Sequence, residues 1–160
     1  MNSIEEILNS QDKKLKVFWA LDCAEHVLFC FEEMFPNDNR LREAITVGRS
    51  WISDGATISD VRIASVSAHN IAREIVQTDF CCKDLTPLSE GSGPQAAACA
   101  AARAVGQAVA TAHAEGHAPN AATYALKAAA AVFPDNPDEA VSKERQWQYQ
   151  RLLELTGSES

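Results

Sequence analysis

Basic residues are scarce in this sequence relative to acidic ones. It contains 14 lysines and arginines against 22 aspartates and glutamates, which gives a formal charge of −8 at neutral pH. Binding to nucleic acid depends on neutralising phosphates with lysine and arginine, so this balance argues against a nucleic-acid partner. An acidic surface instead favours a basic macromolecular partner.

Signals for export, membrane insertion and β-structure are also lacking. Residues 1–12 are polar and acidic, without the basic start and apolar core of a signal peptide. The longest weakly polar stretch is rich in alanine, which is barely apolar, and Gln107, Thr111 and His113 interrupt it. We therefore expect no membrane span.

The cysteine content does not provide a disulfide framework. An odd number of cysteines without a secretory signal indicates reduced thiols and a cytoplasmic protein. The five cysteines are Cys23, Cys30, Cys81, Cys82 and Cys99. Cys81 and Cys82 are adjacent and do not form a C-x-x-C motif, so we predict no catalytic thiol.

What the chain does have is alanine, concentrated in residues 94–133. Nineteen of these forty residues are alanine, the strongest helix former, and Arg103, Glu115 and Lys127 are the charged ones. We expect one helix over 95–115, ended by Gly116 in the left-handed conformation, and a second over 119–133. A short connection favours antiparallel neighbours, so the pair is predicted to be a central hairpin covered by the other helices.

The remaining helix signals predict an all-α fold in one domain, residues 1–160. Capping-box spacings begin helices at Ser3, Thr57 and Ser92, while Asn136 with Pro137 begins the last, which Gly157 ends. Further helices are predicted over 17–35 and 38–54. The expected fold is a bundle of six to seven helices, with residues 1–14 and 157–160 peripheral and 78–93 a long loop.

One stripe of the predicted helix over 17–35 is a candidate partner-binding surface. Asp22, Glu25, His26 and Glu33 share the stripe with Phe29. An aromatic side chain among carboxylates can anchor a basic protein surface. The alternative is that the N-terminal helix covers Phe29 and the acids are a solvated face, with Asp22 and His26 as an i, i+4 pair.

The histidines raise a second hypothesis. His113 and His117 are four residues apart, a spacing that can place two imidazoles on one helical face for a metal. Further ligands could come from His26, Asp22 or His69. Because Gly116 separates the first pair, we predict no metal and no cofactor, with His113 in the last turn of its helix. The alternative is a metal-dependent helical enzyme that uses His26, His69, His113 and His117.

Several segments resemble the immunity proteins of bacterial polymorphic-toxin systems, which are small all-α proteins. They are GQAVATAH at 106–113 with His117, YALKA at 124–128, ERQWQ at 144–148 with 151–152, WALDCAE at 19–25, and 67–69 with 72–74. The resemblance covers about residues 19–152. It implies a non-enzymatic protein that binds a cognate toxin in the cytoplasm and blocks it. A helical module that associates with itself stays open as an alternative.

Overall fold

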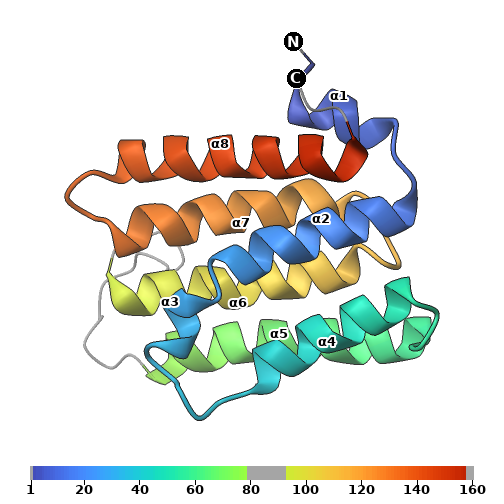
Figure 1. Ribbon diagram of the computed structural model, residues 1–160. Helices are drawn as coiled ribbons and strands as arrows, with labels where there is room; N and C mark the ends of the chain where they lie inside the picture. Colours follow the sequence, from blue (N-terminus) through green and yellow to red (C-terminus); the bar gives the residue numbers. More distant parts are fainter. Residues whose placement is uncertain (1, 79–92, 158–160) are drawn as a thin grey trace.

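The computed structural model describes residues 2–78 and 93–157, and its regular structure is entirely α-helical over these ranges, so the predicted all-α fold is confirmed. Figure 1 shows the arrangement. The helices are α1 (Ile4–Asn9), α2 (Lys13–His26), α3 (Phe29–Glu32), α4 (Arg40–Ile52), α5 (Ile58–Thr78), α6 (Pro94–Ala110), α7 (His117–Val132) and α8 (Pro137–Thr156). The loop predicted at 78–93, with Cys81 and Cys82, lies almost wholly outside the described residues.

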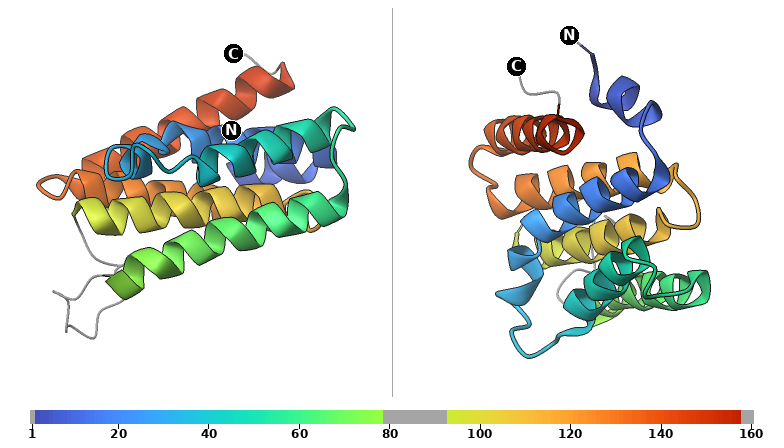
Figure 2. Two further views of the ribbon diagram at one scale, coloured as in Figure 1. Left: turned by 90° about the horizontal axis from the view of Figure 1, so that it is seen from below. Right: turned by 45° about the vertical axis from the view of Figure 1, so that its right-hand side comes forward.

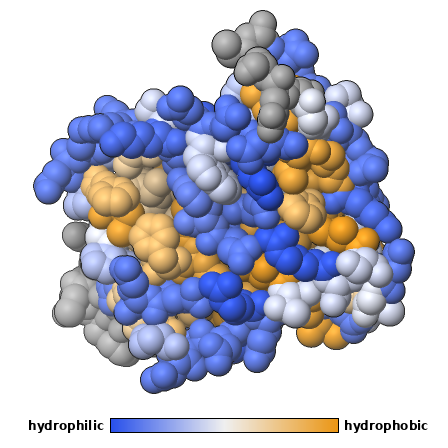
Figure 3. All heavy atoms as spheres, in the orientation of Figure 1, coloured by the Kyte–Doolittle hydropathy of each residue, from blue (hydrophilic) through white to orange (hydrophobic). Residues whose placement is uncertain are grey.

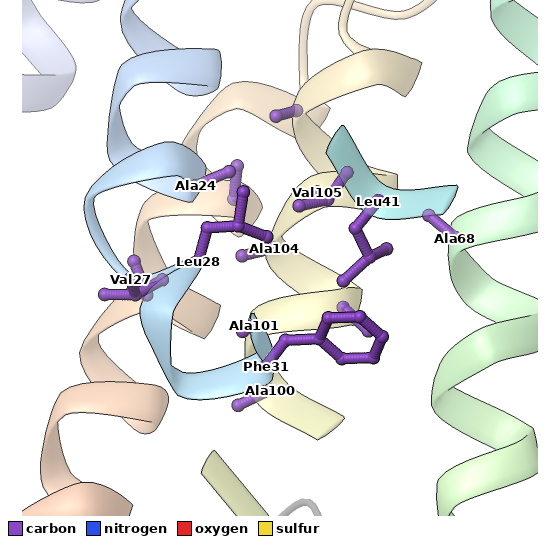
Figure 4. Close-up of a cluster of buried hydrophobic side chains, with 14 of the residues drawn as sticks. Ala24, Val27, Leu28, Phe31, Leu41, Ala68, Ala100, Ala101, Ala104 and Val105 are labelled. Atoms are coloured by element: carbon purple, nitrogen blue, oxygen red, sulfur yellow. The ribbon is translucent and has the colours of Figure 1, made fainter. Parts of the chain in front are cut away.

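The alanine-rich helices α6 and α7 form the centre of the molecule, as the sequence predicts. They pack against each other, with α5 on the other side of α6, α2 across both, and α8 over α7 (Figures 1 and 2). Nearly every residue of α6 is buried, from Ala96 to Ala110, apart from Arg103 and Gln107. Small side chains let these helices approach closely, and larger ones from the outer helices, such as Leu28, Phe31 and Leu41, fill the space against Ala100, Ala101 and Ala104 (Figure 4).

The helix predicted over 17–35 is in fact two helices. Asp12 caps α2 by accepting a hydrogen bond from the Leu15 backbone N–H (2.8 Å), and the helix ends at His26. Val27 leaves the helical conformation (φ −109°, ψ 6°), and α3 is a single turn. Val27 and Leu28 are both buried. The chain therefore changes direction between two buried residues, and Phe29, the next residue, is exposed.

The prediction for the end of the first alanine-rich helix is also wrong. α6 ends at Ala110 instead of residue 115, because the chain tightens into short turns, such as the His113 N–H bond to the Ala110 carbonyl (3.0 Å). Gly116 has a helical φ of −63° and precedes α7, so it begins one helix instead of ending another. His113 accordingly lies in the connection, beyond the last turn of α6.

Most of the predicted helix boundaries in the described ranges are confirmed. Ser3 and Glu6 form a complete capping box, and Thr57 and Asp60 exchange the same two bonds (2.9 and 3.1 Å). Gly157 ends α8 in the left-handed conformation at φ 71°. Asn136 precedes α8 as predicted, but its side-chain amide bonds the Glu139 carboxylate instead of capping the backbone. Ser92 lies outside the described residues.

Buried hydrogen bonds fix α8 against α2 and α7. The Trp19 indole N–H donates to the Gln148 carbonyl, and the Gln148 side-chain amide donates to the Ala122 carbonyl, both at 2.9 Å. Leu8 of α1 packs beside Trp19 and Leu152 in a small second core. Since Trp19 and Gln148 are fully buried, these bonds hold α8 in one register and position the residues it presents to the surface.

Within the described residues, no helix combines the length and apolar character that crossing a membrane requires.

Candidate partner-binding surface

Two acids of the predicted stripe are bound to arginines of other helices. Asp22, at the middle of α2, accepts from Arg49 of α4 (2.9 Å) and Arg151 of α8 (2.7 Å), and its side chain is 11% exposed. The bond to Asp22 raises the pKa of Arg151 above its ordinary value. Asp22 therefore joins three helices, and the predicted i, i+4 pair with His26 does not describe its partners.

Glu25 belongs to the same network. It accepts from Arg49 and, at 3.3 Å, from Arg42 of α4. Arg42 also donates to Glu32 of α3 (2.7 Å), and this bond lowers the pKa of that carboxyl. Arginines thus compensate much of the negative charge along α2. This part of the stripe therefore carries less net negative charge than its own sequence indicates.

Phe29 and Glu33 lie beyond the break, on the surface. Phe29 begins α3 and is 41% exposed, and Glu33 follows one turn later and is also exposed. α1 packs on α8 instead of covering Phe29, so that part of the alternative reading is wrong. The structure therefore separates the predicted site into a paired half, Asp22 and Glu25, and an exposed half.

Phe29, but not Glu33, lines a cavity of about 490 Å³ between the α2–α3 break, the end of α7 and the first turns of α8. Its walls include Phe29, Phe133 and Trp147, and Phe133 is 56% exposed. Figure 3 shows hydrophobic residues gathered over the part of this face where α3 and the α7–α8 connection lie. We call this feature the aromatic cavity. Its volume falls in the range of binding pockets, about 300–1,000 Å³.

His26 forms one wall of the aromatic cavity together with α8. Its ring stacks on Trp147 with centroids 3.7 Å apart and planes 1° from parallel. Its Nδ1 lies 2.8 and 2.9 Å from the two carboxylate oxygens of Glu144, which is almost fully buried. A carboxylate only accepts, so Nδ1 carries the proton in this bond. The wall is therefore held in place by a stack and by a charge-assisted hydrogen bond.

The four histidines of the metal hypothesis do not converge. His26 bonds Glu144 at the cavity, whereas His113 and His117 face each other with ring centroids 5.7 Å apart at the α6–α7 connection. His117 bonds Gln107 through Nδ1 (2.7 Å), and His69 packs against Gly106. Burial lowers the pKa of His69, with nearby Arg103 adding to the effect. Across residues 2–78 and 93–157, no three histidine, cysteine or acidic side chains are grouped as a metal site requires.

The thiols in the described ranges are buried. Cys23, Cys30 and Cys99 are free and almost inaccessible. Burial raises the pKa of the Cys30 thiol to about 12 and raises that of Cys23 as well. Such thiols stay protonated near neutral pH and behave as small core residues, because the thiolate is the nucleophile.

Sequence reasoning missed half of the aromatic cavity. Phe133 precedes Pro134 at the end of α7, and Trp147 and Glu144 lie one turn apart on α8. Their distance in sequence from Phe29 and His26 exceeds a hundred residues, so no local pattern joins them. The one available signal was Phe133 itself, a large apolar residue beside a proline at a helix end.

The chain is thus a small all-α bundle with exposed aromatic side chains, Phe29 and Phe133, around a surface cavity. A family model described as "Imm-5 like putative immunity protein" matches residues 6–83 and 89–155. The chain therefore belongs to this immunity-protein family, which confirms the resemblance found in the sequence. No curated protein and no solved structure matches the chain.

Proposed function

We propose that this protein neutralises a cognate bacterial toxin by binding it directly in the cytoplasm, without catalysing a reaction. Membership of the immunity-protein family supports the neutralising role. The observation that carries the binding mode is the exposure of Phe29 and Phe133 beside a preformed cavity. Large aromatic side chains are the usual anchors of protein interfaces.

We propose that the binding surface comprises Asp22, Glu25, Phe29 and Glu33. Phe29 supplies the apolar contact and Glu33 an exposed acid beside it. Asp22 and Glu25 bind Arg49 of α4, and Asp22 also binds Arg151 of α8, so these ion pairs hold α2, α4 and α8 together and keep the surface in place. The charge of −8 favours a basic toxin domain.

The test needs the cognate toxin, and the genes beside the one for this protein are the first place to search for it. Purified protein should abolish the toxin's activity at a one-to-one ratio, and co-expression should protect cells. Phe29→Ala should weaken binding by about 30-fold or more, the effect of losing an interface anchor. Ile63→Ala is the matched control, since Ile63 is a large apolar residue on α5 that is 67% exposed. A toxin that stays fully active in the presence of excess wild-type protein would refute the proposal.

A further inference from the structure

We infer that the aromatic cavity receives one large apolar side chain of the toxin, flanked on the toxin by basic residues. This inference rests on the proposed function and specifies the chemistry of its site. It names the occupant, a single anchor side chain, and the wall that holds it, formed by Phe29, Phe133 and the stacked pair His26 and Trp147.

The size and lining of the cavity fit such an anchor. An engineered protein cavity of about 150 Å³ already binds benzene, and this one measures about 490 Å³. An aromatic or branched aliphatic side chain therefore fits with part of its backbone. Apolar groups supply most of the surface: Val27, Phe29, Ala129, Phe133, Ala140 and Trp147. Water in the cavity finds few hydrogen-bond partners on such a lining. An apolar occupant that displaces this water therefore binds favourably, because apolar surface is removed from water.

The part of the cavity wall formed by His26 and Trp147 is held by contacts within the protein, without any partner. The His26 ring is fixed from its face by Trp147 and from its Nδ1 edge by Glu144, whose carboxylate is buried. Gln148, one residue beyond Trp147, is fully buried and bonded to α7. A wall that needs no ordering on association loses little conformational entropy, which is the condition for a strong anchor site.

Charge around the cavity selects what flanks the anchor. Residues 133–144 contain four acids and one lysine: Asp135, Asp138, Glu139, Glu144 and Lys143. Lys143 pairs with Glu139 at 2.8 Å. Asp135 and Asp138 are exposed and adjacent in sequence to Asn136 and Glu139, which line the cavity, and Glu33, directly after α3, is also exposed. Lysine or arginine beside the anchor complements these acids, whereas a second copy of this chain would bring the same acids and its own charge of −8.

Filling the cavity tests the inference without removing any wall residue. Ala140 lines it from α8, and Ala140→Trp places an indole where the anchor would sit. Ser142→Trp is the matched control, because Ser142 is exposed on the same helix and lines a different surface, with Trp19 and Tyr149. Ala140→Trp should weaken toxin binding by at least about 30-fold, mainly through faster dissociation. Ser142→Trp should change it less than about threefold.

Thermal melts test whether both variants fold. If Ala140→Trp prevents folding, Ala140→Leu takes its place. Wild-type affinity in the folded Ala140 variant would overturn the inference while leaving the proposed function intact. A dimer of the wild-type protein that Ala140→Trp abolishes, measured by sedimentation, would also overturn it, since the occupant would then be a second copy.

A probe independent of the toxin separates the two proposals. Amide chemical shifts are recorded during titration with the capped dipeptides acetyl-Phe-Arg-amide and acetyl-Phe-Glu-amide. The arginine peptide should shift His26, Phe29, Phe133 and Trp147 at millimolar concentration, and the glutamate peptide should bind more weakly. Shifts elsewhere, or equal binding of both peptides, would overturn the inference. Selective binding by a protein that fails to inhibit the toxin would reject the proposed function alone.

Discussion

At the scale of single residues, α6 and α5 approach each other closely where Gly106 meets His69. A Cβ atom on Gly106 would lie 2.7 Å from Cε1 and Nε2 of the His69 ring. Ser65, one turn earlier on α5, donates to the Gly106 carbonyl at 3.0 Å. Gly106 is therefore needed for close helix approach, not for a special backbone conformation.

Gly106→Ala should destabilise the protein by roughly 1–3 kcal/mol, because the new methyl group collides with the His69 ring. In a His69→Ala background the same change should be neutral or stabilising, by up to about 1 kcal/mol, since alanine is the better helix former. Urea unfolding of the four proteins gives the coupling free energy. Equal effects of Gly106→Ala in both backgrounds would show that the ring moves aside without strain.

His69 should also make stability depend on pH. Burial and nearby Arg103 hold its pKa below the ordinary histidine value of about 6.5. The unfolded chain then takes up a proton at a higher pH than the folded protein does, so this residue lowers stability as pH falls below about 6.5. His69→Gln should reduce the loss of unfolding free energy between pH 7.5 and 5.5. If urea titrations show the same loss of unfolding free energy between these pH values in His69→Gln as in the wild type, other groups cause the loss.

At the scale of helices, the alanine hairpin tolerates little added volume. Ala108 is fully buried in α6, whereas Lys127 of α7 is exposed, with its ammonium 5.0 Å from the Tyr124 ring centroid. Ala108→Leu should overpack the interface and cost roughly 1–3 kcal/mol of unfolding free energy. Lys127→Ala should cost within about 0.5 kcal/mol. Similar, negligible values in denaturant titrations would contradict a tightly packed hairpin.

Local patterns predicted where helices begin better than where they break. The Ser3 and Thr57 caps and the Gly157 stop each depend on residues within four positions, so the sequence contains the whole signal. The break at Val27 has no glycine or proline to announce it. Val27 and Leu28 at the break are both buried in the core with residues that come later in the chain, so the local sequence carries no signal for it.

The candidate site follows the same division. Phe29 and the acids of α2 were found from their spacing on one helix, yet the pairing of Asp22 with Arg151 and of His26 with Glu144 spans 129 and 118 residues. Such partners are set by how α8 docks, through the buried bonds of Trp19 and Gln148. The sequence therefore indicates the exposed aromatic residue but not the cavity behind it.

At the scale of the whole molecule, the position of charge on the surface, beyond the net charge of −8, should control how fast the toxin associates. Replacing either of two acids by lysine changes the net charge by the same amount at a different place. Glu33 lies beside Phe29, and Glu5 lies on α1, which packs against the other end of α8 (Figure 1). Neither Glu33 nor Glu5 takes part in the arginine network of Glu25, so replacing them tests charge without breaking that network.

Glu33→Lys should slow association with a basic toxin, because the approaching surface then meets a lysine beside its anchor site. Glu5→Lys changes the net charge equally but should slow association less, because no residue of α1 lines the cavity, whereas Glu33 lies four residues from Phe29, which does. Screening over about 8–10 Å in ordinary buffers makes the local position of a charge matter. Stopped-flow association rates at about 0.05 and 0.5 M salt test this: the wild-type rate should fall with salt, and the difference between wild type and Glu33→Lys should shrink. The dissociation rate should change less than the association rate. Association that ignores salt, or equal slowing by both variants, would place the toxin on a face other than the one formed by α3 and the start of α8.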